Sequence, residues 1–302
     1  MKLDGRRILL TGASSGIGRE VARTLGGRGA RVALVGRDRA RLEVVRGEVR
    51  ERGGEAAVVV ADLAESGVAD RVAGLAGREL GGPLDAAVFV AGVNRFVPFD
   101  RERDEEVERM FRVNVLAPLS LTRALLPGWR DRAAGRAVFV GSVFGALGFP
   151  CFAAYSATKA ALRGFTEALR RELAGTGVTV TLVQPRATKT PMTDDQGRLA
   201  EATKMKLDPP GKVAERLVRA LERGEREVVI GVPERIFVKL NAVVPGLIDR
   251  ALGKEAARIR PLAEERLAAE GVPEDGERSW RQDQRTNPNE EGLDVRVDVH
   301  PG

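Results

Sequence analysis

The chain has 302 residues, of which 43% are hydrophobic and 30% charged, values that suit one large globular α/β domain or two smaller ones. It contains one cysteine, Cys151, and one histidine, His300, which excludes an intramolecular disulfide and argues against metal sites and Ser-His-Asp catalysis. The net charge of +6 comes from scattered arginines without a basic block, so we expect no nucleic-acid partner.

Short apolar segments alternate with amphipathic ones from the N-terminus onward. The first strand is predicted at 7–11, the first helix at 16–28 and the second strand at 31–35. Further strands are predicted at 56–61, 86–90, 137–140, 178–183 and 227–230, and the intervening helices at 38–53, 68–80, 103–126, 155–173 and 211–221. This alternation predicts a Rossmann-type, doubly wound α/β fold with a mainly parallel seven-stranded sheet.

The turn between the first strand and the first helix is rich in glycine. Gly12 and Gly18 flank a segment that includes Ser14, Ser15 and Ile17. Glycine allows the backbone to approach a pyrophosphate closely, and the free N–H groups at a helix start bind the anion. The position of this turn inside a strand–helix–strand unit therefore predicts a dinucleotide site, the alternative being a purely structural tight turn.

The end of the second predicted strand indicates which dinucleotide is bound. Arg37 stands where folds that bind NAD carry an acidic residue for the ribose 2′-hydroxyl, and Asp38 comes only in the following turn. An arginine at this position accommodates a 2′-phosphate. We therefore expect NADP(H), unless Arg37 is only a solvated surface residue.

Functional side chains follow several strand ends. Ligands of such sheets bind beyond the carboxyl ends of the strands, so residues at these ends are expected to converge. The residues at or just after predicted strand ends include Gly12, Arg37, Asp62, Gly92, Ser142 and Pro185.

Tyr155, the only tyrosine of the chain, lies one helical turn before Lys159. Positions i and i+4 share a helix face, so the phenol and the ammonium are expected to point into the same space. A nearby cation favours the phenolate, which predicts a lowered pKa for Tyr155 and a role in proton transfer. The alternative is a partly buried tyrosine beside a solvated lysine.

Together these motifs resemble the short-chain dehydrogenase/reductase family over residues 5–232. The resemblance is carried by Thr11-Gly-Ala-Ser-Ser-Gly-Ile-Gly18, Ala91-Gly92, Asn114, Ser142, Tyr155-x-x-x-Lys159 and Pro185. It implies that Tyr155 exchanges a proton with a carbonyl or alcohol oxygen to which Ser142 also donates a hydrogen bond. It further implies that Lys159 lowers the Tyr155 pKa and binds the nicotinamide ribose, and that Asn114 holds a water linking Lys159 to solvent.

The resemblance also implies cofactor contacts along the same strand ends. The implied contacts are Gly12, Ser14, Ser15, Ile17, Gly18, Arg37, Asp62, Leu63, Ala91, Gly92, Asn114, Tyr155, Lys159, Pro185, Thr188 and Thr190.

Two positions depart from the family pattern. Phe89 and Val90 replace two asparagines before Ala91-Gly92, which removes two amides that could tie neighbouring backbone. Arg186 replaces the glycine that usually follows Pro185, and an arginine is costly if the backbone there needs a positive φ.

After the predicted seventh strand the chain continues for about 70 residues. Apolar residues recur with helical spacing over 236–252, where Pro245 should break or kink the helix, and a second helix is expected at about 255–269. The first segment could pack on the body over the substrate cleft, form a subunit contact, or lie on a membrane surface. We expect a helical extension over 233–270 and a polar, flexible tail over 271–302.

These observations predict an NADP(H)-dependent oxidoreductase that acts on a carbonyl or secondary alcohol. An apolar or lipid-like substrate is indicated by Phe144, Leu147, Phe149, Phe152 and Met192. The resemblance also implies a homodimer or homotetramer. We expect the protein to be cytoplasmic or peripheral to a membrane, since no apolar run of signal-peptide or membrane-spanning length is present. The alternative, motivated by the departures at Phe89-Val90 and Arg186, is a non-catalytic NADP-binding regulator or scaffold on the same fold.

Overall fold

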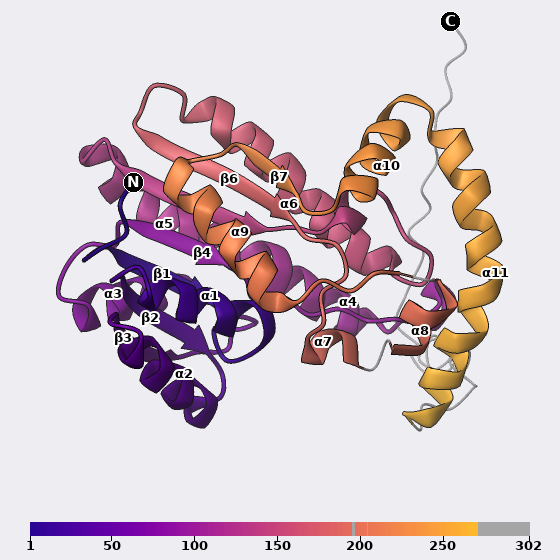
Figure 1. The fold of residues 1–302 in the computed structure, drawn as a ribbon, viewed down its shortest axis with the longest axis horizontal. Coiled ribbons are helices and arrows are strands. Elements are labelled where there is room, and N and C mark those ends of the chain that lie inside the picture. The colour runs from indigo at the N-terminus through magenta and orange to yellow at the C-terminus, as the bar shows by residue number, and fades with distance from the viewer. Residues whose placement is uncertain (195–196, 204, 271–302) are drawn as a thin grey trace, which may run out of the picture.

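The computed structural model describes residues 1–194, 197–203 and 205–270 (Figure 1), so the predicted tail lies outside the described residues. Seven parallel strands form one sheet in the order β3-β2-β1-β4-β5-β6-β7. The strands are β1 (Arg7–Thr11), β2 (Arg31–Gly36), β3 (Glu55–Val60), β4 (Ala86–Phe89), β5 (Gly135–Val140), β6 (Val178–Gln184) and β7 (Glu227–Val229). The predicted Rossmann-type parallel fold is confirmed.

The sheet is buried on both faces, which explains why its strands are continuous apolar runs. Helices α1 (Gly16–Gly26), α2 (Arg39–Glu51) and α9 (Pro210–Arg223) cover one face, and α3 (Val68–Glu79), α5 (Ala117–Asp131) and α6 (Ala153–Glu172) the other. Along β1, Ile8 and Leu10 join the first core while Leu9 joins the second, as the alternation of side chains in a strand requires.

The strand order places the candidate site. Strand β1 pairs with β2 on one side and with β4 on the other, so the direction of winding reverses between β1 and β4. Ligands bind at such a reversal, beyond the carboxyl ends of the strands. The glycine-rich turn after β1 and the Ala91-Gly92 segment after β4 both lie there.

The single helix predicted over 103–126 is divided in the structure. Helix α4 (Asp104–Phe111) is followed by a π-helical turn, η2 (Arg112–Leu116), and then by α5. The prediction merged these elements because one widened turn hardly changes the apolar periodicity. A π-helical turn often marks a functional position, and this one contains Asn114.

Four further helices lie around the site end of the sheet. The loop after β6 contains α7 (Pro191–Asp194) and α8 (Gly197–Ala202), and the C-terminal extension contains α10 (Val232–Val243) and α11 (Pro245–Ala269). The predicted break at Pro245 is confirmed. The second helix begins earlier than predicted, because α11 runs without interruption from Pro245 through Pro261.

Helix α11 packs on the body of the protein beside α8 (Figure 1). Its buried residues Ile259 and Ala263 join a separate apolar cluster with Phe96, Phe149 and Phe152. Helix α11 therefore packs against this aromatic cluster. In the segment 236–252, for which packing on the body was one of three interpretations, Val238 and Ile248 are buried.

This packing predicts a large cost for truncating Ile259, which is fully buried. We expect Ile259→Ala to lower the free energy of unfolding by about 2–5 kcal/mol, measured by urea denaturation. The control Leu247→Ala lies on the same helix but is 58% exposed, and should change it by no more than about 0.5 kcal/mol. Equal stability of the two variants would show that α11 does not pack as described.

Candidate active site

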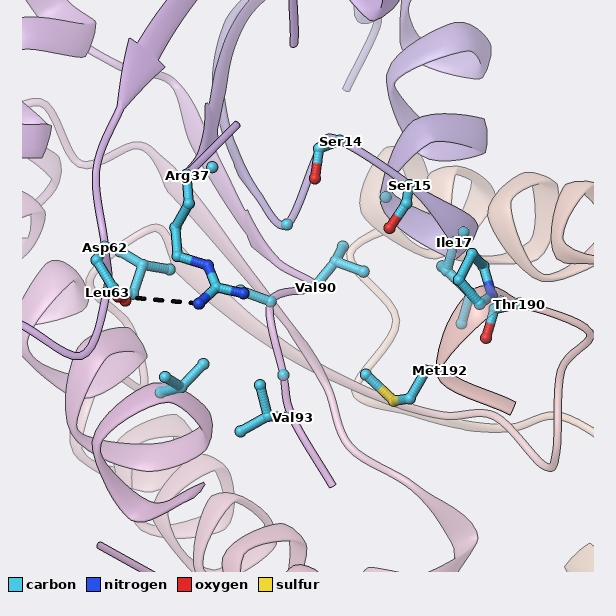
Figure 2. Close-up of a pocket in the computed structure, with 18 of the residues that line it drawn as sticks. Ser14, Ser15, Ile17, Arg37, Asp62, Leu63, Val90, Val93, Thr190 and Met192 are labelled. Carbon is cyan, nitrogen blue, oxygen red and sulfur yellow. Dashed lines mark ion pairs between the residues drawn. The ribbon is translucent and has the colours of Figure 1, made fainter. Parts of the chain in front are cut away.

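Two adjoining pockets open beyond the carboxyl ends of the strands. The first is lined by the glycine-rich turn and the ends of β2, β3 and β4 (Figure 2), and the second by the ends of β5 and β6 and the start of α6. The residues that line both are Ile17, Val90, Gly92, Thr190 and Met192. The two pockets thus form one continuous site with two ends.

The structure brings together nearly all of the predicted cofactor contacts. The first pocket contains Gly12, Ser14, Ser15, Ile17, Gly18, Arg37, Asp62, Leu63, Ala91, Gly92 and Thr190, and the second adds Tyr155, Lys159, Pro185 and Thr188. Asn114 lines neither pocket and lies fully buried behind them. The prediction missed Arg109 and Val113 of the region around α4, because nothing in an amphipathic pattern shows that they reach the first pocket.

The glycine-rich turn is packed too tightly for side chains. A Cβ atom at Gly12, whose φ is +69°, would lie 2.7 Å from the Ala91 nitrogen, and one at Gly18 would lie 2.0 Å from the Gly12 oxygen. The Ala91 N–H donates to the Thr11 hydroxyl at 3.2 Å. The turn after β1 is therefore held against the segment after β4, with a backbone surface that a phosphate group can approach closely.

The region of Phe89 and Val90 is held without the asparagines found in related sequences. Phe89 is buried, with its ring centroid 4.8 Å from that of Phe139. Asn114 holds the segment that follows, because its Oδ1 accepts from the Val93 N–H and its Nδ2 donates to the Val93 carbonyl, both at 2.8 Å. These contacts hold the backbone that the two missing amides could have tied.

The rim of the first pocket carries two arginines that share one carboxylate. Arg37 Nη1 lies 4.0 Å and Arg109 Nη2 3.5 Å from Asp62 Oδ2, and Figure 2 shows Arg37 reaching across the pocket toward Asp62. The Arg37 side chain is 63% exposed. One carboxylate cannot neutralise two guanidinium groups, so this end of the site keeps a net positive charge next to the glycine-rich turn.

Ser142, Tyr155 and Lys159 meet in the second pocket. The Ser142 hydroxyl accepts from the Phe144 N–H at 3.1 Å and interacts with the Tyr155 hydroxyl. The Lys159 ammonium donates to the Val140 carbonyl at 2.9 Å and lies 5.6 Å from the centroid of the Tyr155 ring. The helix spacing of four residues therefore does place both groups in one space.

Burial shifts the pKa values of this pair in the directions that favour the uncharged forms of both side chains. It raises the pKa of Tyr155 to about 12, partly offset by the hydrogen bond with Ser142, and it lowers the pKa of Lys159 to about 8. The direction for Tyr155 is opposite to the predicted one, because the loss of hydration outweighs the stabilisation of the phenolate by Ser142. Tyr155 keeps some exposure through the pocket, although protein atoms surround its phenol.

Asn114 lies behind the two pockets and connects their walls through hydrogen bonds. Its second amide hydrogen is donated to the Thr158 hydroxyl at 3.0 Å, and Thr158 in turn donates to the Tyr155 carbonyl at 2.7 Å. Both amide hydrogens are therefore used. A water bound at this side chain would have to donate to Oδ1 and accept from a neighbour such as Lys159, so the predicted relay role stays a prediction.

Comparison with known proteins identifies the family. A family model for short chain dehydrogenases matches residues 6–199. The chain belongs to the short-chain dehydrogenase/reductase family. Members of this family are oxidoreductases that use nicotinamide cofactors and act on small molecules.

Curated relatives of this chain come from bacteria and animals. It is 32% identical to ketoacyl reductase HetN of Nostoc sp., over 82% of this chain and 88% of that protein. It is 31% identical to dehydrogenase/reductase SDR family member 7B of Bos taurus, over 84% and 82% respectively. It is 32% identical to very-long-chain 3-oxoacyl-CoA reductase of Anas platyrhynchos, over 62% and 61%.

Arg186, where the family usually has glycine, takes part in a buried ion-pair network. Its side chain is 9% exposed and donates to both carboxylate oxygens of Asp208 at 2.8 Å, and to Glu234 at 3.3 Å. Lys212 also contacts Asp208, at 3.1 Å. The expected strain is absent, because among the described non-glycine residues only Ala133 and Cys151 have positive φ.

This network ties the short-chain dehydrogenase/reductase core to its C-terminal extension. Asp208 pairs with Thr188 in an isolated β-bridge, and Glu234 belongs to α10. Arg186 therefore joins the loop after β6, the segment before α9 and the extension, all beside the second pocket. Sequence reasoning missed it because both acidic partners are distant in the chain.

Removing the Asp208 carboxylate should destabilise the protein strongly. Arg186 holds the pKa of Asp208 below its usual range, so the ion pair contributes stability above about pH 4, and that stability is lost as the pH falls through the lowered pKa. We expect Asp208→Asn to lower the free energy of unfolding by about 3–5 kcal/mol at neutral pH, because it leaves a buried guanidinium without its main partner.

The control for this prediction is Asp131→Asn, an exposed carboxylate at the end of α5, which should change the free energy of unfolding by no more than about 0.5 kcal/mol. Urea denaturation over a pH series measures both variants. A loss of stability at Asp208→Asn that is no larger than the control's would contradict the network.

Proposed function

We propose that the protein is an NADP(H)-dependent oxidoreductase that transfers a hydride between the nicotinamide and a carbonyl or secondary alcohol of an apolar substrate. The observation that carries this proposal is the meeting of Ser142, Tyr155 and Lys159 in a pocket that adjoins a glycine-lined nucleotide pocket. The proposal includes a homodimer or homotetramer, the assemblies usual in the family.

The side chains of the second pocket suit proton transfer to an oxygen that gains negative charge. When bound, the cofactor supplies or accepts the hydride. During reduction, Ser142 and Tyr155 donate hydrogen bonds to the carbonyl oxygen, and Tyr155 gives its proton as the alkoxide develops. A phenol with a pKa of about 12 stays protonated at neutral pH, so it is ready to act as the acid.

Lys159 supports this step through its charge. With a pKa of about 8, most of its amine is protonated at neutral pH, and the cation stabilises the phenolate that remains after proton transfer. Its position against the Val140 carbonyl fixes the ammonium below the ring of Tyr155. In the reverse direction the same groups remove a proton from an alcohol.

The first pocket fits a nucleotide with a 2′-phosphate. The contacts at Gly12 and Gly18 leave no room for side chains there, as expected of a surface that a pyrophosphate occupies. At the other end of this pocket, the two positive charges of Arg37 and Arg109 exceed the single negative charge of Asp62. This excess of positive charge supports NADP(H) over NAD(H).

An apolar substrate is supported by the lining of the second pocket, which includes Phe144, Phe152, Leu199 and Met205. Two relatives carry names that point the same way, a ketoacyl reductase and a very-long-chain 3-oxoacyl-CoA reductase. We therefore propose ketones attached to long apolar chains as the first substrates to assay.

Replacing Tyr155 by phenylalanine should remove catalysis and keep nucleotide binding. We expect Tyr155→Phe to lower kcat/KM for a ketone by roughly 10²–10⁴-fold, since the proton donor is lost while the first pocket is unchanged. NADPH oxidation over a panel of ketones measures the rate, and NADPH fluorescence measures binding. Equal turnover by variant and wild type would refute the mechanism. Tight NADPH binding by a wild type without turnover would favour the non-catalytic regulator or scaffold.

Cofactor choice is tested separately at Arg37. We expect Arg37→Asp to raise the KM for NADPH roughly 10- to 100-fold, because a charged hydrogen bond is replaced by repulsion, and to leave the KM for NADH nearly unchanged. The control Arg41→Asp removes an arginine from α2 that does not line the pocket. An unchanged preference between NADPH and NADH in the Arg37 variant would disprove the phosphate role.

A further inference from the structure

The C-terminal extension exposes an unusual number of apolar side chains. Among the described residues, seven of the twelve large hydrophobic side chains that are exposed to solvent lie between positions 232 and 247. We call these seven residues the elbow patch, since they follow α10 and its turn into α11. They are Val232, Ile236, Phe237, Leu240, Val243, Val244 and Leu247.

The orientation of α10 is fixed from its opposite face. Glu234 accepts from Arg186, Val238 is buried, and Asn241 donates to the Ala146 carbonyl at 2.9 Å. These three positions follow helical spacing on one side of α10. The apolar residues on the other side therefore point outward, and cannot be turned into the core without breaking these contacts.

Basic side chains border the elbow patch. Over 232–254 the exposed cations are Arg235, Lys239, Arg250 and Lys254. The acidic residues of the same segment are Glu234 and Asp249, and Glu234 is already paired with Arg186. Beside the start of α10, a surface hollow is also lined by Lys206, Lys212 and Arg216, of which Lys212 pairs with Asp208 and Arg216 with Glu225. The surroundings of the patch therefore carry a net positive charge.

We propose that the elbow patch binds the surface of an anionic phospholipid bilayer. The apolar side chains enter the boundary between headgroups and acyl chains, while the basic side chains contact lipid phosphates. The proposed contact is with one leaflet. Among the described residues, no helix has the length and apolar content of a membrane span. A second copy fits less well, because a two-fold contact would bring the same cations of both copies together.

The patch is structurally joined to the second pocket. Asn241 holds the loop that follows Ser142, and α11 continues from the patch to the aromatic cluster around Phe149 and Phe152 (Figure 1). The connection between the patch and the substrate rests on the proposed function. An apolar substrate dissolved in the bilayer would reach the pocket beside α10 and α11 without passing through bulk water.

The experiment is vesicle flotation of the full-length protein. The vesicles are phosphatidylcholine alone, or phosphatidylcholine with about 30% phosphatidylserine. We expect binding to the anionic vesicles that weakens as salt is added, and much weaker binding to the zwitterionic ones. The double variant Phe237→Ser/Val243→Ser should lower the partition coefficient roughly tenfold or more. The control Val44→Ser, an apolar residue of α2 that is 59% exposed, should leave it unchanged.

A charge variant tests the second half of the proposal. Arg235→Glu/Lys239→Glu should abolish the preference for anionic vesicles, whereas Arg50→Glu, an exposed arginine of α2, should not. The proposal is overturned if the wild type does not prefer anionic vesicles, or if the patch and control variants bind alike. It is also overturned if light scattering gives a lower molar mass for the patch variant than for the wild type while the variant still binds vesicles. The patch would then form a contact between two copies of the chain.

Turnover of a short water-soluble ketone separates this inference from the proposed function. Neither the elbow patch nor Arg235 and Lys239 belong to the catalytic or nucleotide machinery. That turnover should therefore be the same in the wild type, in the double serine variant and in the charge variant. Vesicle binding without turnover would contradict only the proposed function. Turnover without vesicle binding would contradict only the membrane contact.

Discussion

The burial of Lys159, and the loss of most of the hydration of Tyr155 beside it, is the constraint on which the rest of the site depends. It is achieved by close contacts around the lysine: a Cβ atom at Gly145 would lie 2.6 Å from the Lys159 carbonyl carbon, and one at Gly92 would lie 3.5 Å from its Nζ. Chain segments after β4 and β5 are thereby packed directly on α6. The same packing sets the pKa values of both groups, so geometry and acidity have one origin.

Much of the fold and most of the site could be predicted because they depend on local pattern. Buried parallel strands are continuous apolar runs, and the residues that follow them must gather at one edge of the sheet. The positions of Gly12, Gly92 and Ser142 at this edge could therefore be predicted without knowledge of any distant contact, and that of Tyr155 from its helical spacing to Lys159. Arg109 was missed, since its place in the site depends on how α4 packs.

The wrong expectations share one physical cause, namely that burial and long-range partners are not visible in a local sequence pattern. The sequence shows that Lys159 is near Tyr155, but not that both lose most of their hydration. It shows an arginine where glycine is usual, but the partners Asp208 and Glu234 lie 22 and 48 residues away. Arg186 is accommodated because those distant acids give it a buried, paired position with an ordinary backbone conformation.

The two helices of the extension differ in what they contact. Helix α11 supplies buried residues such as Ile259 to the aromatic cluster, while α10 is held by Arg186 and Ala146 with its apolar face outward. One helix thus packs against the aromatic cluster beside the pocket, and the other presents a surface. The buried ion pairs of Arg186 with Asp208 and Glu234 tie α10 to the core, which explains why a charged residue at this position is compatible with the fold.

The most direct test of the account is the titration of Tyr155 itself. Because it is the only tyrosine of the chain, the absorbance of tyrosinate reports this one group. The account predicts that the free protein, still folded by circular dichroism, shows no tyrosinate up to at least about pH 10.5, since the pKa lies near 12. A titration midpoint below about 10 would contradict the claim that burial governs this pair.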